Sequence, residues 1–350
     1  MFITTLILII LTFVSYLASK YVLRLAIKKN IVDDPTAAPE RKDQKKPVPL
    51  LGGIGFGIIG IVASFATFVV YRFNLFGLHN YLEQNMFNGF HFGWILVACC
   101  IILVGGYIDD KYNLSPKKLL IPVNLALFVG VILGGLKINT LSYPFDWIVF
   151  GPFLQYFLAY IWVGLCLSAT KFLDGHDGLV SSVGIINLSS IALISSFASI
   201  DQPFITIISL IWVAAIAGFL PFNLPNAKMY LGESGSELIG FLIGVMSIIS
   251  GAKIATTATI VGWFIFDLVL VIYIRWKNKK NIVKGGREHW HFRLLDAGLS
   301  KWQVLGLTLA ILITSGFFGL ILPTIYKPYV FLGQLMVFFA IYCWTNNRKN

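Results

Sequence analysis

The chain has 350 residues, of which 57% are hydrophobic and only 12% are charged, and its formal net charge is +11. Soluble domains average about 45–50% apolar and about 25% charged residues, so this composition excludes a disordered chain, a coiled coil and an ordinary soluble enzyme. It predicts a protein that lies mostly in lipid. The cysteines show no metal or disulfide spacing and are interpreted as small hydrophobic residues in apolar stretches: Cys99, Cys100, Cys166 and Cys343.

Eleven apolar segments are long enough to cross a hydrocarbon core of roughly 30 Å, which takes about 20 helical residues. We therefore predict an all-α, polytopic membrane protein with about 11 transmembrane helices, forming a single transmembrane domain over residues 1–350. The first segment has no basic residue before it and no small-residue cleavage site after it, so we expect a retained helix. The segments are 2–26, 51–73, 91–108, 118–136, 152–170, 179–198, 203–221, 235–251, 254–274, 303–322 and 328–345.

The basic residues predict the orientation. With the N-terminus outside and the C-terminus cytoplasmic, only four of the 27 Lys and Arg residues lie outside: Arg72, Lys137, Lys253 and Lys327. This is the positive-inside asymmetry, so the basic charge requires no nucleic acid partner. Part of the excess is available to anionic lipid or an anionic substrate. We expect a multi-pass protein of the cell (plasma or inner) membrane, with its site in the cytoplasmic loops near 27–50, 109–117, 171–178, 222–234 and 275–302.

The third apolar segment ends in two adjacent acids, Asp109 and Asp110. Adjacent carboxylates repel each other unless a cation lies near them. A helix C-terminus is also the unfavourable pole for negative charge. The pair is a candidate catalytic or cation-binding site, and the simpler alternative is a solvated helix end with Lys111 as ion-pair partner.

Two glycine-rich elements follow further along the chain. Asp174-Gly175-His176-Asp177-Gly178 places two carboxylates on one side of a turn, and its glycines permit close approach of a ligand. An ordinary turn, with Lys171 as partner of either acid, is the alternative. Gly232-Glu233-Ser234-Gly235-Ser236 opens a helix and offers backbone N–H groups and hydroxyls to an anion such as phosphate. A capped helix start is the alternative there.

The last inner loop contains two His and two Arg residues within Arg287–Arg293, a composition suited to phosphate or sugar recognition. His289 and His291 share a face only if this piece is extended. Asp267 lies inside an apolar segment. An intramembrane acid is a functional candidate by default, and a structural partner for a polar group on a neighbouring helix is the alternative.

In this order the motifs resemble those of the polyprenyl-phosphate N-acetylhexosamine-1-phosphate transferases, glycosyltransferase family 4, from about Val32 to Gln303. That family includes phospho-N-acetylmuramoyl-pentapeptide transferase and the enzymes that start O-antigen and wall teichoic acid synthesis. The matching elements are Asp34-Pro35, Arg41-Lys42, Pro47–Gly53, Gly106–Asp110 with Leu114-Ser115, Asp174–Leu179, Asn223–Ser236, Asp267, and Arg287–Leu295 with Gly298-Leu299-Ser300.

The resemblance implies transfer of an N-acetylhexosamine-1-phosphate from a UDP-sugar to polyprenyl phosphate, with release of UMP. The cofactor implied is Mg²⁺, with Mn²⁺ as a substitute, and the metal ligands implied are Glu233 and Asp110. Membrane lipid is a further partner, and a homodimer is left open. Catalytic roles are implied for Asp109, Asp110, Asp174 and Asp177, and substrate-binding roles for Lys118, Lys171, Asn223, His289, His291 and Arg293.

The segment Arg287–Leu295, called the His loop below, is similar to the corresponding loop of the GlcNAc-type branch. We therefore expect an undecaprenyl-phosphate GlcNAc-1-phosphate transferase that starts lipopolysaccharide or teichoic acid synthesis. Phospho-N-acetylmuramoyl-pentapeptide transferase activity is the alternative. A transporter is disfavoured because the halves show no duplication. A CDP-alcohol phosphatidyltransferase is disfavoured because Leu179-Val180-Ser181 follows the second Asp-Gly pair.

Several positions depart from the family pattern and keep an inactive relative as a rival hypothesis. Lys171 stands in place of an amide, and Glu233 in place of an aspartate. Glu233 offers oxygen to Mg²⁺ through a longer arm. Lys171 adds a cation beside the acids, where it either holds the substrate diphosphate or partly displaces the metal. The other departures are Phe292 and Gln44 in place of histidines, and a basic residue offset to Lys117 and Lys118.

Overall fold

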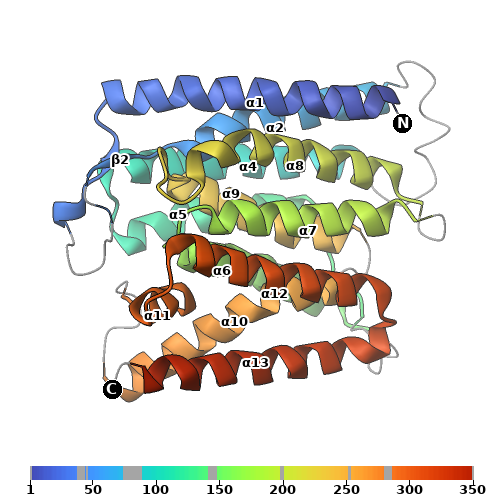
Figure 1. The fold of residues 1–350 in the computed structure, drawn as a ribbon. Coiled ribbons are helices and arrows are strands. Elements are labelled where there is room, and N and C mark those ends of the chain that lie inside the picture. The colour runs from blue at the N-terminus through green and yellow to red at the C-terminus, as the bar shows by residue number, and fades with distance from the viewer. Residues whose placement is uncertain are drawn as a thin grey trace.

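The structure is a computed structural model. It describes residues 2–37, 44, 46–73, 89–140, 148–197, 201–250, 254–279 and 286–348. Long helices lie side by side in a bundle, with the N-terminus at one end and the C-terminus at the other (Figure 1). The segment between α1 and α2 contributes a short antiparallel pair, β1 (Val32–Asp33) and β2 (Val48–Pro49), at the same end as the C-terminus.

The helices coincide with the apolar segments of the sequence, and the predicted all-α polytopic fold is confirmed. The helices of the described residues are α1 (Phe2–Lys28), α2 (Gly52–Arg72), α4 (Gly89–Tyr112), α5 (Pro116–Leu127), α6 (Pro152–Leu173), α7 (Leu179–Ser195), α8 (Pro203–Asn223), α9 (Gly232–Ile249), α10 (Ile254–Lys277), α11 (Trp290–Asp296), α12 (Lys301–Ile321) and α13 (Lys327–Asn347). Short η1 (Pro35–Ala37), η3 (Phe128–Leu133) and η4 (Thr324–Tyr326) complete them.

Ten helices of the described chain are long and apolar enough to cross a membrane. The one predicted span that is not among these ten, 179–198, corresponds to the shorter apolar helix α7. Its 17 residues extend about 25 Å at 1.5 Å per residue, slightly less than a full hydrocarbon core. The predicted orientation, with the motif-bearing end toward the cytoplasm, stays a prediction.

Local sequence sets where several helices begin. Proline occupies the first turn of α5, α6, α8 and α13, where a missing N–H costs nothing. At the start of α12, the Ser300 hydroxyl accepts from the backbone of Gln303, whose side-chain oxygen accepts from the Ser300 backbone. This reciprocal cap fixes the point at which the last inner loop re-enters the bundle.

Helix α9 is the centre of the bundle. Its membrane-length window is 89% buried, compared with 17% for α1 and for the span that contains α13. It contacts α2, α4, α6, α7 and α10. Its buried position brings the polar first turns of α9, with Glu233 and Glu237, into contact with the neighbouring helices.

Two glycines bring α2 and α4 into backbone contact with the start of α9. A Cβ atom added to Gly53 would overlap the backbone of Gly235, and one added to Gly106 would overlap the backbone of Ser234. The loop before α9 is tied to the same place, because the Gly53 N–H donates to the Leu231 carbonyl at 2.8 Å. The motif-bearing loops are therefore fixed by close packing at one end of the bundle.

We predict that Gly53→Ala lowers the apparent Tm of the protein in detergent. Overpacking of a closed contact typically costs about 1–3 kcal/mol, and here the obstacle is backbone that has no rotamer to change. Gly306→Ala is the control, because a Cβ there meets nothing within 4 Å. Equal Tm values for the two variants, measured by thermal unfolding, would contradict the packing described here.

Candidate active site

The sequence-predicted acids gather where the C-terminus of α4, the C-terminus of α6 and the N-terminus of α9 meet. Asp110 forms the central contact. Its Oδ1 accepts the backbone N–H of Glu233 at 2.8 Å, and its Oδ2 accepts the Ser234 hydroxyl at 3.4 Å. Gly232 has a φ of 71°, and a Cβ there would overlap the Asp110 carboxylate. Only glycine allows this approach without strain.

This contact changes the electrostatic interpretation of Asp110. The residue stands near the C-terminal end of its own helix, which is unfavourable for a carboxylate. The same carboxylate lies at the N-terminus of α9, where free N–H groups and the helix dipole favour negative charge. The α9 terminus therefore explains how an acid is accommodated at this helix end.

Lys171, in the last turn of α6, forms an ion pair with Glu233. The Lys171 ammonium also lies 3.6 Å from Oε1 of Glu237, one turn further along α9. The Glu237 side chain is only 2% exposed, whereas that of Lys171 is 33% exposed. One cation is therefore shared between two carboxylates, and the predicted partnership of Lys171 with Asp174 or Asp177 is not among its ion pairs.

The other two acids near this contact have different surroundings. Asp109 is partly buried, and its Oδ1 accepts the backbone N–H of Leu114 at 2.9 Å, which closes the turn after α4. Asp174 caps the end of α6. Burial raises the pKa of Asp174 well above its usual range, and the charges of Glu233 and Asp110 raise it further, against a hydrogen bond from Ser236.

Asp177 and Asn223 hold the loop before α9. The buried Asp177 carboxylate accepts Lys301 Nζ at 2.8 Å and the backbone N–H of Asn226 at 3.0 Å through Oδ2. Asn223 accepts the Ser181 hydroxyl at 2.8 Å and donates to the Met229 carbonyl at 3.3 Å. Both predicted site residues therefore connect the 224–231 loop to its neighbours, and their predicted catalytic and substrate-binding roles stay predictions.

Asp267 anchors the His loop. Its Oδ2 lies 2.8 Å from Nδ1 of His289, and its Oδ1 accepts the backbone N–H of Trp290 at 2.7 Å. All three residues are buried. The structure thus realises the structural alternative for this intramembrane acid, since a helix-borne carboxylate orients a loop histidine.

His291 packs against the Asp-Gly-His-Asp-Gly turn. A Cβ at Gly175 would lie 2.5 Å from its Nε2, and the His176 ring lies 6.2 Å away, measured between ring centres. His291 is fully buried, and burial lowers its pKa well below the usual range, with further lowering from His289. Its imidazole is therefore neutral at physiological pH.

The remaining predicted substrate-binding cations lie elsewhere. The guanidinium of Arg293 donates to the Glu288 carbonyl at 2.7 Å and covers the Tyr342 ring of α13. Lys118 is exposed in the first turn of α5. Of the first-loop residues, Gln44 bridges Asp33 and Tyr230. The predicted Arg41-Lys42 element lies outside the described residues.

The carboxylate oxygens of the site suit a hard cation such as Mg²⁺, although they do not form a complete coordination shell. Within the described ranges, no group of three or more His, Cys, Asp or Glu side chains converges closely enough to hold a metal ion. Mg²⁺ keeps several waters and is commonly bound by one or two carboxylates. Asp110 and Glu233 offer two carboxylates toward that lower requirement, and the Asp110 carboxylate contacts the backbone N–H of Glu233.

Sequence reasoning missed Glu237, Lys301 and the Arg275–Glu288 pair, whose closest atoms are 2.9 Å apart. Glu237 carried a usable signal, since it lies in an apolar helix one turn after Glu233. The partner of Lys301 is 124 residues away and had no local signal, whereas Arg275 and Glu288 are 13 residues apart in the same predicted loop.

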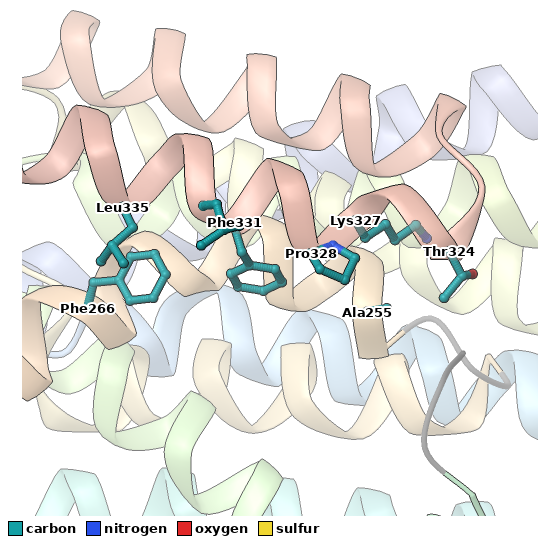
Figure 2. Close-up of a pocket in the computed structure, with 8 residues that line it drawn as sticks. Ala255, Phe266, Thr324, Lys327, Pro328, Phe331 and Leu335 are labelled. Carbon is teal, nitrogen blue, oxygen red and sulfur yellow. The ribbon is translucent and has the colours of Figure 1, made fainter. Parts of the chain in front are cut away.

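A pocket outside this site lies between α10 and α13, toward the opposite end of the bundle (Figure 2). Its wall is apolar, including Phe266 and Phe331, except for Thr324 and Lys327 near one end. None of the predicted site residues lines it.

Comparison with known proteins identifies the class. The chain belongs to glycosyl transferase family 4, whose profile matches residues 92–251, as the motifs predict. A probable undecaprenyl-phosphate N-acetylglucosaminyl 1-phosphate transferase of Bacillus subtilis is 33% identical over 79% of this chain and 73% of its own length.

Two further relatives mark the breadth of the similarity. An undecaprenyl-phosphate α-N-acetylglucosaminyl 1-phosphate transferase of Escherichia coli is 27% identical over 80% of this chain and 73% of its own length. A phospho-N-acetylmuramoyl-pentapeptide-transferase of Staphylococcus epidermidis is 26% identical over 81% of this chain and 87% of its own length.

We predict that Asp267→Asn lowers the apparent Tm, because the amide presents a donor in place of one acceptor oxygen. Loss of a buried hydrogen bond to a charged group costs about 1.5–3 kcal/mol. Asp296→Asn is the matched control, since it breaks an ion pair with Arg287 in which both side chains are nearly a third exposed. Such pairs contribute up to about 1 kcal/mol. A larger loss in the control, measured by thermal unfolding, would contradict the anchoring role.

Proposed function

We propose that this protein transfers GlcNAc-1-phosphate from UDP-GlcNAc to undecaprenyl phosphate, releasing UMP. The observation that carries the proposal is the contact of Asp110 with the N-terminus of α9 at Glu233, in a chain that belongs to glycosyl transferase family 4. Relatives named for this reaction at 33% and 27% identity support the choice of sugar. The muramoyl-pentapeptide alternative has the weaker support of a 26% relative.

The reaction joins two anions, so its main requirement is control of charge. The phosphate oxygen of the lipid attacks the β-phosphorus of the UDP-sugar and forms a new O–P bond. The bond between the β-phosphorus and the bridging oxygen breaks, and UMP leaves with that oxygen. A phosphate monoester with a second pKa near 6 is mostly ionised at neutral pH, so no strong base is needed. Positioning and electrostatic stabilisation then supply most of the catalysis.

The residues divide these tasks. Asp110 and Glu233 would hold Mg²⁺, which would counter the charge of the diphosphate. Asp109 commits Oδ1 to the turn after α4, and its other oxygen orients the lipid phosphate. Lys171, fixed at the same place, binds the diphosphate, and Asp174 positions the substrate or the metal. A covalent aspartyl intermediate is the alternative to this direct attack.

The His loop closes the site from the side of α10. His289, oriented by Asp267, and the neutral His291 position the sugar-phosphate portion beside the 174–178 turn. The long apolar helices support a site within reach of a lipid acceptor, and the positive-inside pattern supports a cytoplasmic position for the motif-bearing end, on the side where the nucleotide sugar is made. We propose the bacterial plasma membrane as the location.

Substitutions at Glu233 test the metal assignment. We expect Glu233→Ala and Asp110→Ala each to lower kcat by about 100-fold or more, since each removes a ligand that acts on transition-state charge. Glu233→Asp restores a carboxylate and should retain measurable turnover. Asp201→Asn removes an exposed acid at the opposite end and serves as the control. Near-normal kcat in either alanine variant would refute the assignment.

The reaction itself is tested by UMP release from purified protein in detergent. Undecaprenyl phosphate and Mg²⁺ are supplied with UDP-GlcNAc, UDP-GalNAc or UDP-MurNAc-pentapeptide in separate reactions. We expect UMP only where lipid, Mg²⁺ and UDP-GlcNAc are all present. UMP release with another donor would show that the enzyme uses that sugar nucleotide in place of UDP-GlcNAc. Absence of UMP with every donor, from protein of normal Tm, would favour the inactive relative.

A further inference from the structure

Lys171, which the proposed reaction assigns to the diphosphate, pairs with Glu237, a residue to which that reaction assigns no role. Lys171 reaches across from α6 to α9, where its ammonium lies between Glu233 and Glu237. The two glutamates are four residues apart on α9, so they occupy the same helix face. The ammonium is therefore held between two carboxylates of one helix.

Glu237 depends on this cation. Its side chain is 2% exposed, and Oε1 accepts no hydrogen bond from the described part of the chain. The Lys171 ammonium at 3.6 Å is the ion-pair partner of that oxygen. A buried carboxylate without a nearby cation is strongly unfavourable, so Glu237 and Lys171 stabilise each other in this place.

Lys171 changes the charge of the site, and Glu237 lies beside it. Lys171 stands where the family pattern has a neutral amide, so it adds one positive charge to a site built from acidic residues. The Glu237 carboxyl lies within ion-pair distance of that ammonium.

We propose that Glu237 is a positioning residue, which holds the Lys171 ammonium beside Glu233 so that it meets the diphosphate of the nucleotide sugar. This inference rests on the proposed function. Sharing matters, because an ammonium paired with Glu233 alone neutralises that carboxylate and competes with any cation bound there. Because Lys171 also pairs with Glu237, its interaction with Glu233 is weaker than in an exclusive pair. Both Lys171 and Glu233 can then contact the substrate.

A double-mutant cycle tests the pairing without any turnover. Lys171→Asn strands the buried Glu237 and should lower the apparent Tm by about 5 °C or more. Adding Glu237→Gln to that variant should restore most of the loss. Lys137→Asn, which removes an exposed lysine at the opposite end, controls for the loss of a positive charge. A double variant that is as unstable as Lys171→Asn, or less stable, would overturn the pairing.

Kinetics test the positioning role. Glu237→Gln alone should raise KM for UDP-GlcNAc about 10-fold with little change in kcat, equivalent to one charge-assisted contact. Glu237→Asp, which keeps the charge, should recover most of that loss. An unchanged KM in Glu237→Gln, or higher turnover in the Lys171→Asn/Glu237→Gln double variant than in the wild type, would overturn the proposal.

Failure of the proposed function and failure of the Lys171–Glu237 inference give different experimental results. Wild-type protein that releases no UMP would fail the proposed function, while the Tm cycle would still report the Lys171–Glu237 pairing. In that case binding of UDP-GlcNAc is measured by the Tm increase it causes. The proposal then requires a smaller increase in Glu237→Gln than in the wild type, and equal increases would contradict it.

Discussion

The rest of the site depends on one interaction, in which the Asp110 carboxylate accepts a hydrogen bond from the N-terminus of α9. The interaction requires α2, α4 and the start of α9 to pack closely together. This explains the tight contacts of Gly53, Gly106 and Gly232 with their neighbours. Once α4 and α9 meet in this way, Glu233 lies next to Asp110, and the end of α6 brings Lys171 to the same point. A single helix terminus therefore organises residues from three parts of the sequence.

The charges of this site explain why its chemistry suits two anionic substrates. Asp109, Asp110, Asp174, Glu233 and Glu237 lie around this contact, where the Lys171 ammonium pairs with Glu233 and Glu237, while Asp177 pairs separately with Lys301. Such an excess of carboxylates is unfavourable by itself and favours binding of a cation. A cation held there would allow negatively charged phosphates to approach. The buried, neutral His291 and the Asp267–His289 pair complete the other side of the site without adding to that negative charge.

Much of the fold could be predicted from the sequence, because a lipid solvent demands long apolar helices and leaves few alternatives. Each of the eleven apolar segments contains a helix among the described residues, and the loops between them gather the motifs at one end. The partners of individual side chains could not be predicted in the same way. Asp177 and Asn223 bind backbone groups of the 224–231 loop, and Arg293 points to α13. These contacts depend on how loops far apart in sequence pack together. The Asp110 contact was hidden for the same reason, since its favourable pole belongs to another helix.

We propose that Asp110 and Glu233 together form the cation-binding part of the site. Anomalous diffraction from crystals grown with Mn²⁺ and a nucleotide sugar tests it most directly, because the scattering locates the ion without reference to activity. We predict an anomalous peak in contact with the carboxylates of both residues. A peak bound by other side chains, or none while Lys171 still covers Glu233, would contradict the account.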